Sequence, residues 1–271
     1  MIPYIEWKTI DLGVIDLQVW GLFVALGFLF GAFMAAWLAK QRGQDPKIVY
    51  DILPWLIFAG LIGGRLGHVF FYAWPYYAAH PLEIFAIWQG GGSIFGGLIA
   101  CGLVGIWYLR RRRVDVMMYV DIFVFGLPFG KWLGRIGCFL IHDHPGTVTD
   151  FILGVKYPDG VIRHDHGLYL SLNALAMAIV FLFLARRPRP AGTYIAIFCL
   201  WYGVVRFFLD FYRAVDVRYF GLTPAQYLCF GLVLIGIVMA VWLGSSRARL
   251  WTPSFANDGV DKEKAQKSLN E

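Results

Sequence analysis

Three arginines lie inside stretches of the chain that are otherwise apolar, and each is surrounded by glycines or aromatic residues: Arg65, Arg135 and Arg206. A guanidinium group inside a lipid bilayer costs at least ~2.5 kcal/mol even on the most lenient insertion scale, so such a group is usually retained for a function. Its planar fork of N–H groups matches the oxygens of a phosphate or a carboxylate. The three arginines therefore indicate a site for an anion inside a membrane protein.

Acidic and aromatic side chains accompany Arg206 at helical spacing. Tyr202 precedes Arg206 by four residues, Asp210 follows it by four, and Arg213 comes three residues later. On a helix these side chains share one face. One interpretation is an ion pair between Arg206 and Asp210 that only lowers the cost of burial. The other, which we favour, is that Asp210 holds Arg206 in position and the guanidinium is offered to a phosphate.

Arg65 and Arg135 have no carboxylate four residues away along the chain. Each could pair with an acidic residue on another segment, or the two could jointly bind an anionic headgroup, which we favour. Lys131, one helical turn before Arg135, could join that site or pair with Asp210. The acidic candidates are Glu83, Asp121, Asp143 and Asp210.

Two His-Asp-His runs lie near the two ends of the longest predicted outer loop. They are His142-Asp143-His144 and His164-Asp165-His166. Two imidazoles alone do not make a metal site, and a four-histidine site is the least favoured interpretation. Acid–base chemistry by one of these histidines is more plausible than metal binding, and solvated loop histidines are the remaining interpretation. His68 is a further base candidate within the membrane. We expect no metal and no cofactor.

Glycines recur every fourth residue in three of the apolar stretches. The series are Gly60 and Gly64, Gly92 and Gly96, and Gly126, Gly130 and Gly134. This spacing lets membrane helices approach each other closely, which is the favoured interpretation. Glycines also let a ligand reach backbone N–H groups, and both roles can hold together.

The elements that position these residues follow from composition. The chain has 271 residues, of which 59% are hydrophobic and only 15% are charged. This balance is too apolar for a soluble domain and indicates a polytopic membrane protein. The four cysteines fall in apolar runs, so a secreted disulfide framework is excluded. The amino terminus lacks the pattern of a cleaved signal peptide, so we expect the first helix to remain.

Seven stretches are long and apolar enough to span a membrane. They are residues 17–39, 50–74, 86–109, 117–140, 168–185, 191–212 and 224–245. The predicted fold is therefore all-α, with a single seven-helix transmembrane domain over residues 1–250. The connection 141–167 is its longest outer loop, and residues 251–271 form a polar tail that we expect to be disordered.

Lysine and arginine are enriched in every second connection, after the first, third, fifth and seventh stretches. Basic loops stay cytoplasmic, so the amino terminus is predicted outside and the carboxyl terminus inside. The net charge of +6 is thus explained by topology and not by nucleic-acid binding. The same topology places Arg65, Arg135, Arg206 and the glycine run 90–97 in the outer half of the bilayer.

Four motifs carry a resemblance to a known family. They are GGRLG around Arg65, WQGGGSIFGG from Trp88, GRIGCF around Arg135, and YGVVRFFLDFYR from Tyr202 to Arg213. With Asp216 and Gln226 beyond them, the chain resembles the bacterial prolipoprotein diacylglyceryl transferases over nearly its whole length. Each motif alone is a weak signal, and the four together are a strong one.

Members of that family transfer a diacylglyceryl group from phosphatidylglycerol to the lipobox cysteine thiol of prelipoproteins. The resemblance implies the same enzyme activity here, in a multi-pass protein at the outer face of the bacterial inner membrane. It implies that the lipid and the prelipoprotein signal peptide are the partners. It further implies that Arg135 and Arg206 contact the lipid phosphate. We assign the supporting positions of the lipid site to Arg65, Tyr202, Asp210, Arg213, Gly91, Gly96 and Gly97.

The chain departs from the family pattern around the expected base and amide ligands. Phe95 stands where the motif usually has a histidine, and Gln89 stands where it has an aspartate. Asp143 aligns with the motif glutamate, and His142 or His144 could replace the lost histidine. We therefore assign acid–base chemistry to His142, Asp143 and His144, beside Arg135 and Arg206.

Two other functions are compatible with the sequence. An enzyme could use phosphatidylglycerol with a different acceptor, which Phe95 in place of histidine favours. A lipid-binding or transport protein would instead be supported by an inverted internal repeat, and the sequence shows none.

Overall fold

The computed structural model describes residues 1–11, 13, 16–86, 91–214 and 218–245, apart from the side chains of Phe71, Ile94 and Phe95. The predictions made for Trp88, Gln89, Asp216 and the tail 251–271 lie outside the described residues. The chain forms two compact units, one of residues Met1–Gln44 with Val120 onward and one of Asp45–Tyr119. A single domain over residues 1–250 stays a prediction.

Each of the seven predicted stretches contains one long helix. They are α1 (Val19–Gln41), α2 (Lys47–Tyr72), α4 (Ile94–Arg111), α5 (Val116–Ile141), α6 (His166–Ala185), α7 (Thr193–Leu209) and α8 (Pro224–Gly244). Among the described residues, six helices are long and apolar enough to cross a membrane, namely all of these except α4. The chain is therefore a polytopic membrane protein, as the composition indicates. A seventh span and the orientation of the termini stay predictions.

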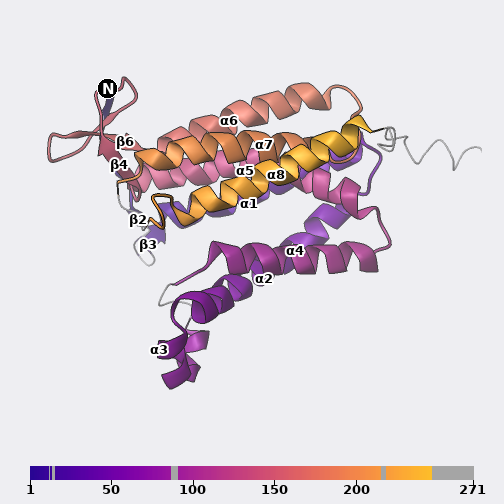
Figure 1. The fold of residues 1–271 in the computed structure, drawn as a ribbon, viewed down its shortest axis with the longest axis horizontal. Coiled ribbons are helices and arrows are strands. Elements are labelled where there is room, and N and C mark those ends of the chain that lie inside the picture. Colours follow the sequence, from indigo (N-terminus) through magenta and orange to yellow (C-terminus); the bar gives the residue numbers. More distant parts are fainter. Residues whose placement is uncertain (12, 14–15, 87–90, 215–217, 246–271) are drawn as a thin grey trace, which may run out of the picture. The chain divides into compact units, whose positions relative to one another are not determined.

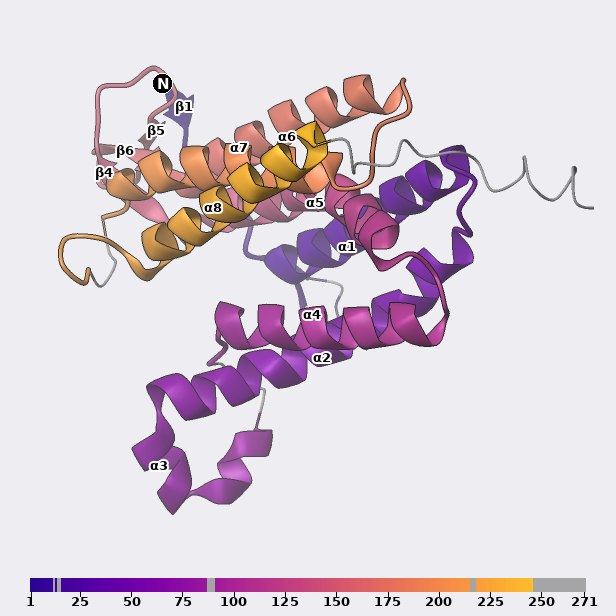
Figure 2. The same cartoon turned by 45° about the vertical axis from the view of Figure 1, so that its right-hand side comes forward.

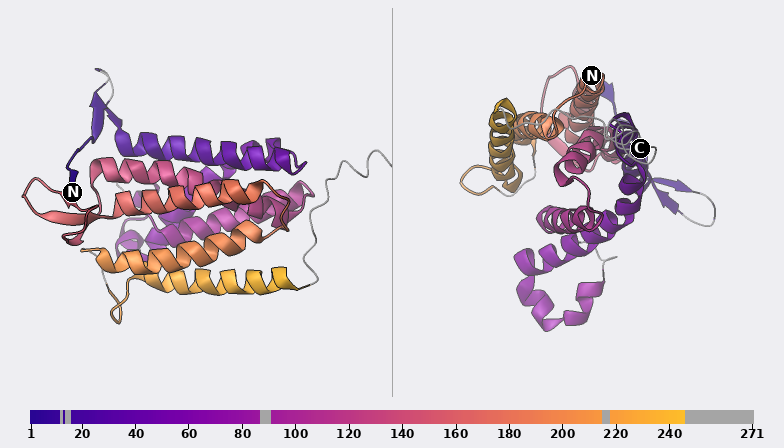
Figure 3. Two further views of the ribbon diagram at one scale, coloured as in Figure 1. Left: turned by 90° about the horizontal axis from the view of Figure 1, so that it is seen from above. Right: turned by 90° about the vertical axis from the view of Figure 1, so that its right-hand side faces the viewer.

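The first unit contains α1, α5, α6, α7 and α8, which run side by side (Figures 1 and 3). Helices α1 and α5 touch through glycines. A Cβ atom on Gly126 would lie 2.4 Å from the Gly31 carbonyl oxygen, and one on Gly130 would lie 2.7 Å from that of Gly27. Both distances are too short for any side chain. The predicted close packing is therefore confirmed for Gly126 and Gly130, whereas the space beside Gly134 is open.

The second unit is built on α2 and α4, which lie side by side (Figure 2). A Cβ atom on Gly96 would lie 2.1 Å from the Gly63 carbonyl oxygen, so the two backbones are in direct contact. Helix α4 begins at Ile94, well after the predicted start at residue 86, because Ser93 caps it. The Ser93 hydroxyl oxygen accepts a hydrogen bond from the Gly96 amide at 3.3 Å. Short helices α3 (Trp74–Ala79) and η1 (Pro81–Phe85) precede it.

Small β-sheets cover one end of the first unit, and the all-α prediction did not include them (Figure 1). One sheet has the order β1 (Ile2–Pro3), β5 (Val155–Lys156), β6 (Ile162–Asp165) and β4 (Pro145–Val148). A second pairs β2 (Thr9–Asp11) with β3 (Asp16–Gln18). The predicted outer loop is thus a folded cap that joins the amino terminus to the segment before α6. It sets the positions of the two His-Asp-His runs.

Candidate active site

An ion pair between Arg206 and Asp210 forms the centre of the site in the first unit. Arg206 Nη2 lies 2.8 Å from Asp210 Oδ1, and Asp210 is fully buried. Helix α7 ends at Leu209 and continues as the short 3-10 turn η3 (Asp210–Tyr212). Arg213 follows the turn, with Nη1 3.9 Å from the same oxygen. The predicted pair is confirmed, and Asp210 also holds a second guanidinium nearby.

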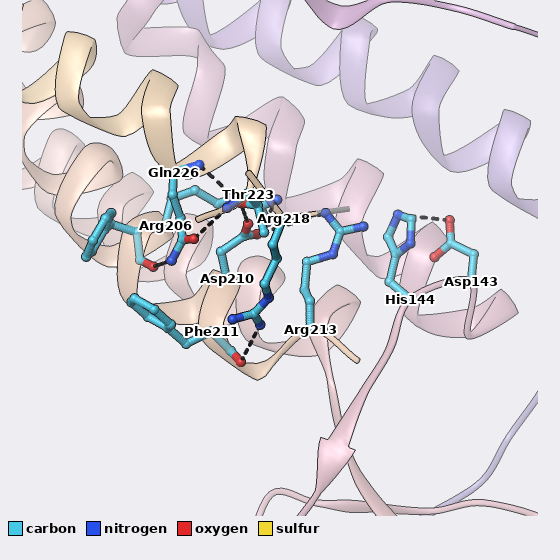
Figure 4. Close-up of polar contacts among 10 residues, drawn as sticks. Asp143, His144, Arg206, Asp210, Phe211, Arg213, Arg218, Thr223 and Gln226 are labelled. Atoms are coloured by element: carbon cyan, nitrogen blue, oxygen red, sulfur yellow. Dashed lines mark hydrogen bonds and ion pairs between the residues drawn. The ribbon is translucent and has the colours of Figure 1, made fainter. Parts of the chain in front are cut away.

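The start of α8 fixes Asp210 from the other side (Figure 4). The Thr223 hydroxyl donates a hydrogen bond to Asp210 Oδ2, and Thr223 also caps α8 together with Gln226. Gln226 Nε2 donates to the Phe207 carbonyl oxygen at 3.1 Å. Arg206 is thus held through a buried network that spans the α7–α8 hairpin. The role of Thr223 was missed, although the sequence Thr-Pro-Ala-Gln predicts a capping box.

Lys131 lies against Tyr202 one helical turn from the arginines. Its ammonium nitrogen is 3.3 Å from the centroid of the Tyr202 ring, a cation–π contact between α5 and α7. Arg135 and Arg206 are both close enough to act on the Lys131 charge. Lys131 therefore joins the cationic site, as one of the two interpretations of the sequence proposed.

Arg135 extends the same cluster from α5. Its Nη1 lies 3.9 Å from the Cys138 sulfur, and no carboxylate of the described residues lies within ion-pair distance of it. Asp121, one of its possible partners, is engaged elsewhere. Its Oδ2 lies 3.7 Å from Arg42 Nη1, and its Oδ1 accepts a hydrogen bond from the Ile195 amide at 3.0 Å. Within the described chain, Arg135 thus has a weak contact to a sulfur and no ion pair that would neutralise its charge.

His144 and Asp143 stand beside Arg213, whose guanidinium points toward the imidazole (Figure 4). His144 Nε2 lies 3.5 Å from Asp143 Oδ2. Burial lowers the pKa of His144, the Asp143 carboxylate opposes this, and Arg213 and Arg135 add to it. The imidazole is therefore neutral at pH 7 and can take up a proton.

His142 is part of the β-sheet cap. Its Nδ1 lies 2.7 Å from Asp165 Oδ2, and its ring stacks on Tyr4 with the centroids 4.2 Å apart. The Tyr157 hydroxyl donates to the same carboxylate oxygen at 3.2 Å, and burial with that carboxylate raises the pKa of Tyr157. These contacts give His142 a structural task, and its assignment to acid–base chemistry stays a prediction.

Sequence reasoning named His166, the first residue of α6, only as a member of its His-Asp-His run and did not include it among the assigned site residues. It is 1% exposed, and neither ring nitrogen has a hydrogen-bond partner among the described residues. The guanidinium groups of Arg206, Arg213 and Arg135 act on its charge, as does His144. The signal that could have located it is Asp165, since an aspartate before an apolar run predicts a helix start.

Arg65 belongs to the second unit, and its contacts are with backbone carbonyls. Its Nη2 donates to the Glu83 carbonyl oxygen at 2.7 Å and to that of Ala86 at 3.1 Å, and its Nε donates to that of Ile84 at 2.9 Å. The partner on another element is therefore the backbone of η1 and not the Glu83 carboxylate. A role of Arg65 in lipid binding stays a prediction.

The glycines assigned to the lipid site also lie in the second unit. Gly91 has a φ of +81°, and a Cβ atom there would lie 2.7 Å from the His68 ring. Gly96 and Gly97 face the glycines of α2, so both serve the contact between the two helices. Their approach to a ligand stays a prediction.

The histidines of the cap do not converge on a common point. Within the described ranges, no group of three or more histidine, cysteine, aspartate or glutamate side chains is placed to hold a metal ion. His164 Nδ1, for example, lies 2.8 Å from the Tyr169 hydroxyl oxygen. A four-histidine site is therefore not formed by these side chains.

Comparison with known proteins gives a consistent result. The family model described as prolipoprotein diacylglyceryl transferase matches residues 8–242. A Geobacter sulfurreducens protein named phosphatidylglycerol–prolipoprotein diacylglyceryl transferase is 35% identical, over 88% of this chain and 95% of its own length. Proteins of the same name from Nitrosospira multiformis and Vibrio atlanticus are 34% and 32% identical. They align with 91% and 89% of this chain, and with 89% and 91% of their own lengths.

Proposed function

The chain belongs to the prolipoprotein diacylglyceryl transferase family, and we propose that it moves a diacylglyceryl group from phosphatidylglycerol to a cysteine thiol of a prelipoprotein. The observation that supports this most is the cationic cluster of Arg135, Arg206 and Lys131. Within this cluster, Asp210 holds Arg206 by an ion pair. A cluster of this kind within apolar helices fits a lipid with an anionic headgroup.

The chemistry requires a negative charge to be stabilised. As the thiol sulfur attacks the glyceryl carbon, the C–O bond to phosphate breaks and glycerol phosphate leaves with the electron pair. Arginines that are already in place lower the energy of that developing charge without reorganising. Arg135 and Arg206 are proposed to contact the phosphate, because Arg135 has no ion pair with a carboxylate of the described residues and Arg206 is held by Asp210.

The site is proposed to lie at the outer face of the bacterial inner membrane. Six helices of the described chain are suited to crossing a bilayer. Basic residues lie in the opposite connections, which supports an outer position for the β-sheet cap and the arginine end of the helices. A prelipoprotein would present its lipobox cysteine there, at the boundary between the apolar helices and water.

A depletion experiment tests the proposal in living cells. A bacterial host whose own transferase can be switched off is given this chain or its Arg206→Gln variant. Growth should be restored by the unchanged chain and not by the variant, with both proteins present in the membrane at equal amounts. Absence of growth with the unchanged chain would contradict the proposed acceptor. If phosphatidylglycerol turnover then persists, the enzyme with a different acceptor becomes the better description.

A further inference from the structure

His166 is a buried histidine. Its backbone position is fixed, but its ring makes no hydrogen bond within the described chain. Asp165 caps α6, since its Oδ1 accepts a hydrogen bond from the Leu168 amide at 3.0 Å. The His166 amide itself donates to the His144 carbonyl oxygen at 3.3 Å. The backbone therefore fixes where the imidazole stands, while both ring nitrogens lack a partner in the described chain. Buried polar atoms without partners are rare and require an explanation.

The surroundings of His166 identify the explanation. Arg206 on α7, Arg213 after η3, His144 before β4 and Arg135 on α5 are near enough for their charges to act on the buried imidazole. The neighbouring Asp165 carboxylate is taken up by His142 and by the helix cap. The unpartnered imidazole thus lies where the arginines assigned to the lipid phosphate converge.

The other histidines of this end have partners or solvent. His142 is paired with Asp165, and His164 with the Tyr169 hydroxyl. The His144 side chain is 35% exposed and lies near Asp143. Among the histidines that the structure describes, only His166 combines near-complete burial, two unpartnered ring nitrogens and the influence of Arg135, Arg206 and Arg213.

Resting on the proposed function, we propose that His166 is the catalytic base that accepts the proton of the acceptor thiol. The S–H proton moves to a ring nitrogen of the neutral imidazole, and the sulfur electron pair forms the new S–C bond to the glyceryl carbon. The C–O bond to phosphate breaks, and glycerol phosphate leaves with its electrons. The imidazolium then returns its proton to the departing phosphate or to water.

The bound lipid assists this step electrostatically. A cation among three guanidinium groups is unfavourable, but the phosphodiester brings one negative charge to the same place. His166 therefore accepts a proton most readily once phosphatidylglycerol has bound. The order of events is lipid first and thiol second, so thiolate is generated only where it can react.

The test uses the full-length protein reconstituted with phosphatidylglycerol and a lipobox peptide, and it compares His166→Gln with His164→Gln. Glutamine can still form hydrogen bonds but cannot take up the proton. His166→Gln should slow transfer at pH 7 by about 10²–10⁴-fold, the range for loss of a general base. Phosphatidylglycerol binding, measured by native mass spectrometry, should be unchanged. The matched control His164→Gln, two residues away, should keep the unchanged rate.

The pH dependence separates a base from a merely structural residue. In His166→Gln the rate should rise about tenfold per pH unit up to the pKa of the thiol near 8.5, because bulk hydroxide then supplies the thiolate. His164→Gln should keep the pH profile of the unchanged enzyme, since His164 is paired with the Tyr169 hydroxyl and is not among the groups that act on the His166 charge. If His166→Gln transfers within threefold of the unchanged rate at pH 7, or if it loses lipid binding in proportion to rate, the proposal is wrong.

A second variant guards against misfolding. His166→Ala leaves room for a free imidazole, which should restore transfer as its concentration rises, whereas guanidinium at the same concentration should not. No restoration in a protein that still binds the lipid would count against His166. An inactive unchanged enzyme would instead contradict the proposed function, so the two failures are distinguishable.

Discussion

At the scale of single residues, Arg206 is positioned before any substrate binds. Asp210 is fully buried, contacts Arg206 and accepts the Thr223 hydroxyl, while Gln226 fixes the preceding turn of α7. A preorganised donor of this kind stabilises developing charge at no cost of reorganisation during the reaction. The chemistry therefore depends on the shape of the guanidinium as well as on its charge.

Arg206→Gln should reduce transfer by at least about 10²–10³-fold, as for loss of one preorganised donor to a developing oxyanion. The protein should remain folded, because Thr223 and Arg213 still contact Asp210. Arg206→Lys should also be poor, because an ammonium cannot reproduce a planar two-donor contact. Product formation from labelled phosphatidylglycerol measures both. Full activity of Arg206→Gln would remove the phosphate site from the account.

Asp210→Asn should be less damaging than loss of Arg206, because Asp210 contacts the guanidinium and is proposed to orient it without touching the lipid. Misplacement of a catalytic group by about 1 Å can cost about 10²-fold, so we expect a loss of that order. The rates of Asp210→Asn and Arg206→Gln are compared in the same membranes. An inactive Asp210→Asn beside an active Arg206→Gln would reverse these roles.

Two cap histidines make stability depend on acidity. Burial lowers the pKa of His144 and of His164 below the ordinary value of 6.5. Between the folded and unfolded pKa values the unfolded chain binds more protons, so stability is fully present above pH 6.5 and falls as pH drops below it. Thermal unfolding in detergent from pH 8 to pH 5 measures this. His144→Gln with His164→Gln should flatten the acid decline, and an unchanged slope would contradict it.

The sequence located the residues of the site better than their partners. Four-residue spacing predicts the pair of Arg206 and Asp210, because i and i+4 side chains meet on any helix. The partners of Arg65 are three carbonyls of a short turn, and carbonyls carry no sequence signal. His166 was named only within its His-Asp-His run and not singled out, because the arginines that act on its charge come from helices far away in the chain.

At the scale of elements, glycines decide how closely α1 and α5 approach. The backbones are in contact at Gly126 and Gly130, and Arg135 lies on the same helix further along. Any side chain at these positions must push α5 away from α1. The position of Arg135 therefore depends on the contact of Gly126 and Gly130 with α1, although these glycines are not assigned to the substrate site.

Gly126→Ala should destabilise the protein by about 1–3 kcal/mol, the usual cost of overpacking, because the new methyl would lie 2.4 Å from the Gly31 carbonyl oxygen. The unfolding temperature in detergent should fall, and transfer should decline with it. Gly231→Ala on α8 is the control, since nothing lies within 4 Å of that position. Equal unfolding temperatures for the two variants would argue against close packing of α1 on α5.

Hydrophobicity predicts long helices and misses short strands. Every predicted stretch contains a helix, because about 20 apolar residues in a bilayer must satisfy their backbone hydrogen bonds internally. The strands of the cap have two to four residues and pair segments far apart, such as Ile2 with Val155. A period-two pattern cannot be recognised over two residues, so the loop 141–167 read as irregular.

At the scale of the whole molecule, the chain combines a bundle of apolar helices with a polar cap at the arginine end of its first unit. The resemblance to the family rested on four sequence motifs that follow one another as they do in the family. The family model, which matches residues 8–242, agrees with it. Physical reasoning alone reached an anion site in a membrane protein. The acceptor thiol came from the resemblance, because nothing in the arginine cluster distinguishes one acceptor from another.

The most direct test of the account is the stoichiometry of one turnover by the purified protein. Vesicles that contain phosphatidylglycerol and a lipobox peptide are incubated with it, and both products are measured by mass spectrometry. The account predicts one glycerol phosphate released for each diacylglyceryl thioether formed. It predicts neither product when the peptide cysteine is serine or when phosphatidylethanolamine replaces phosphatidylglycerol. Glycerol phosphate release without thioether, or thioether formed equally well by Arg206→Gln, would contradict it.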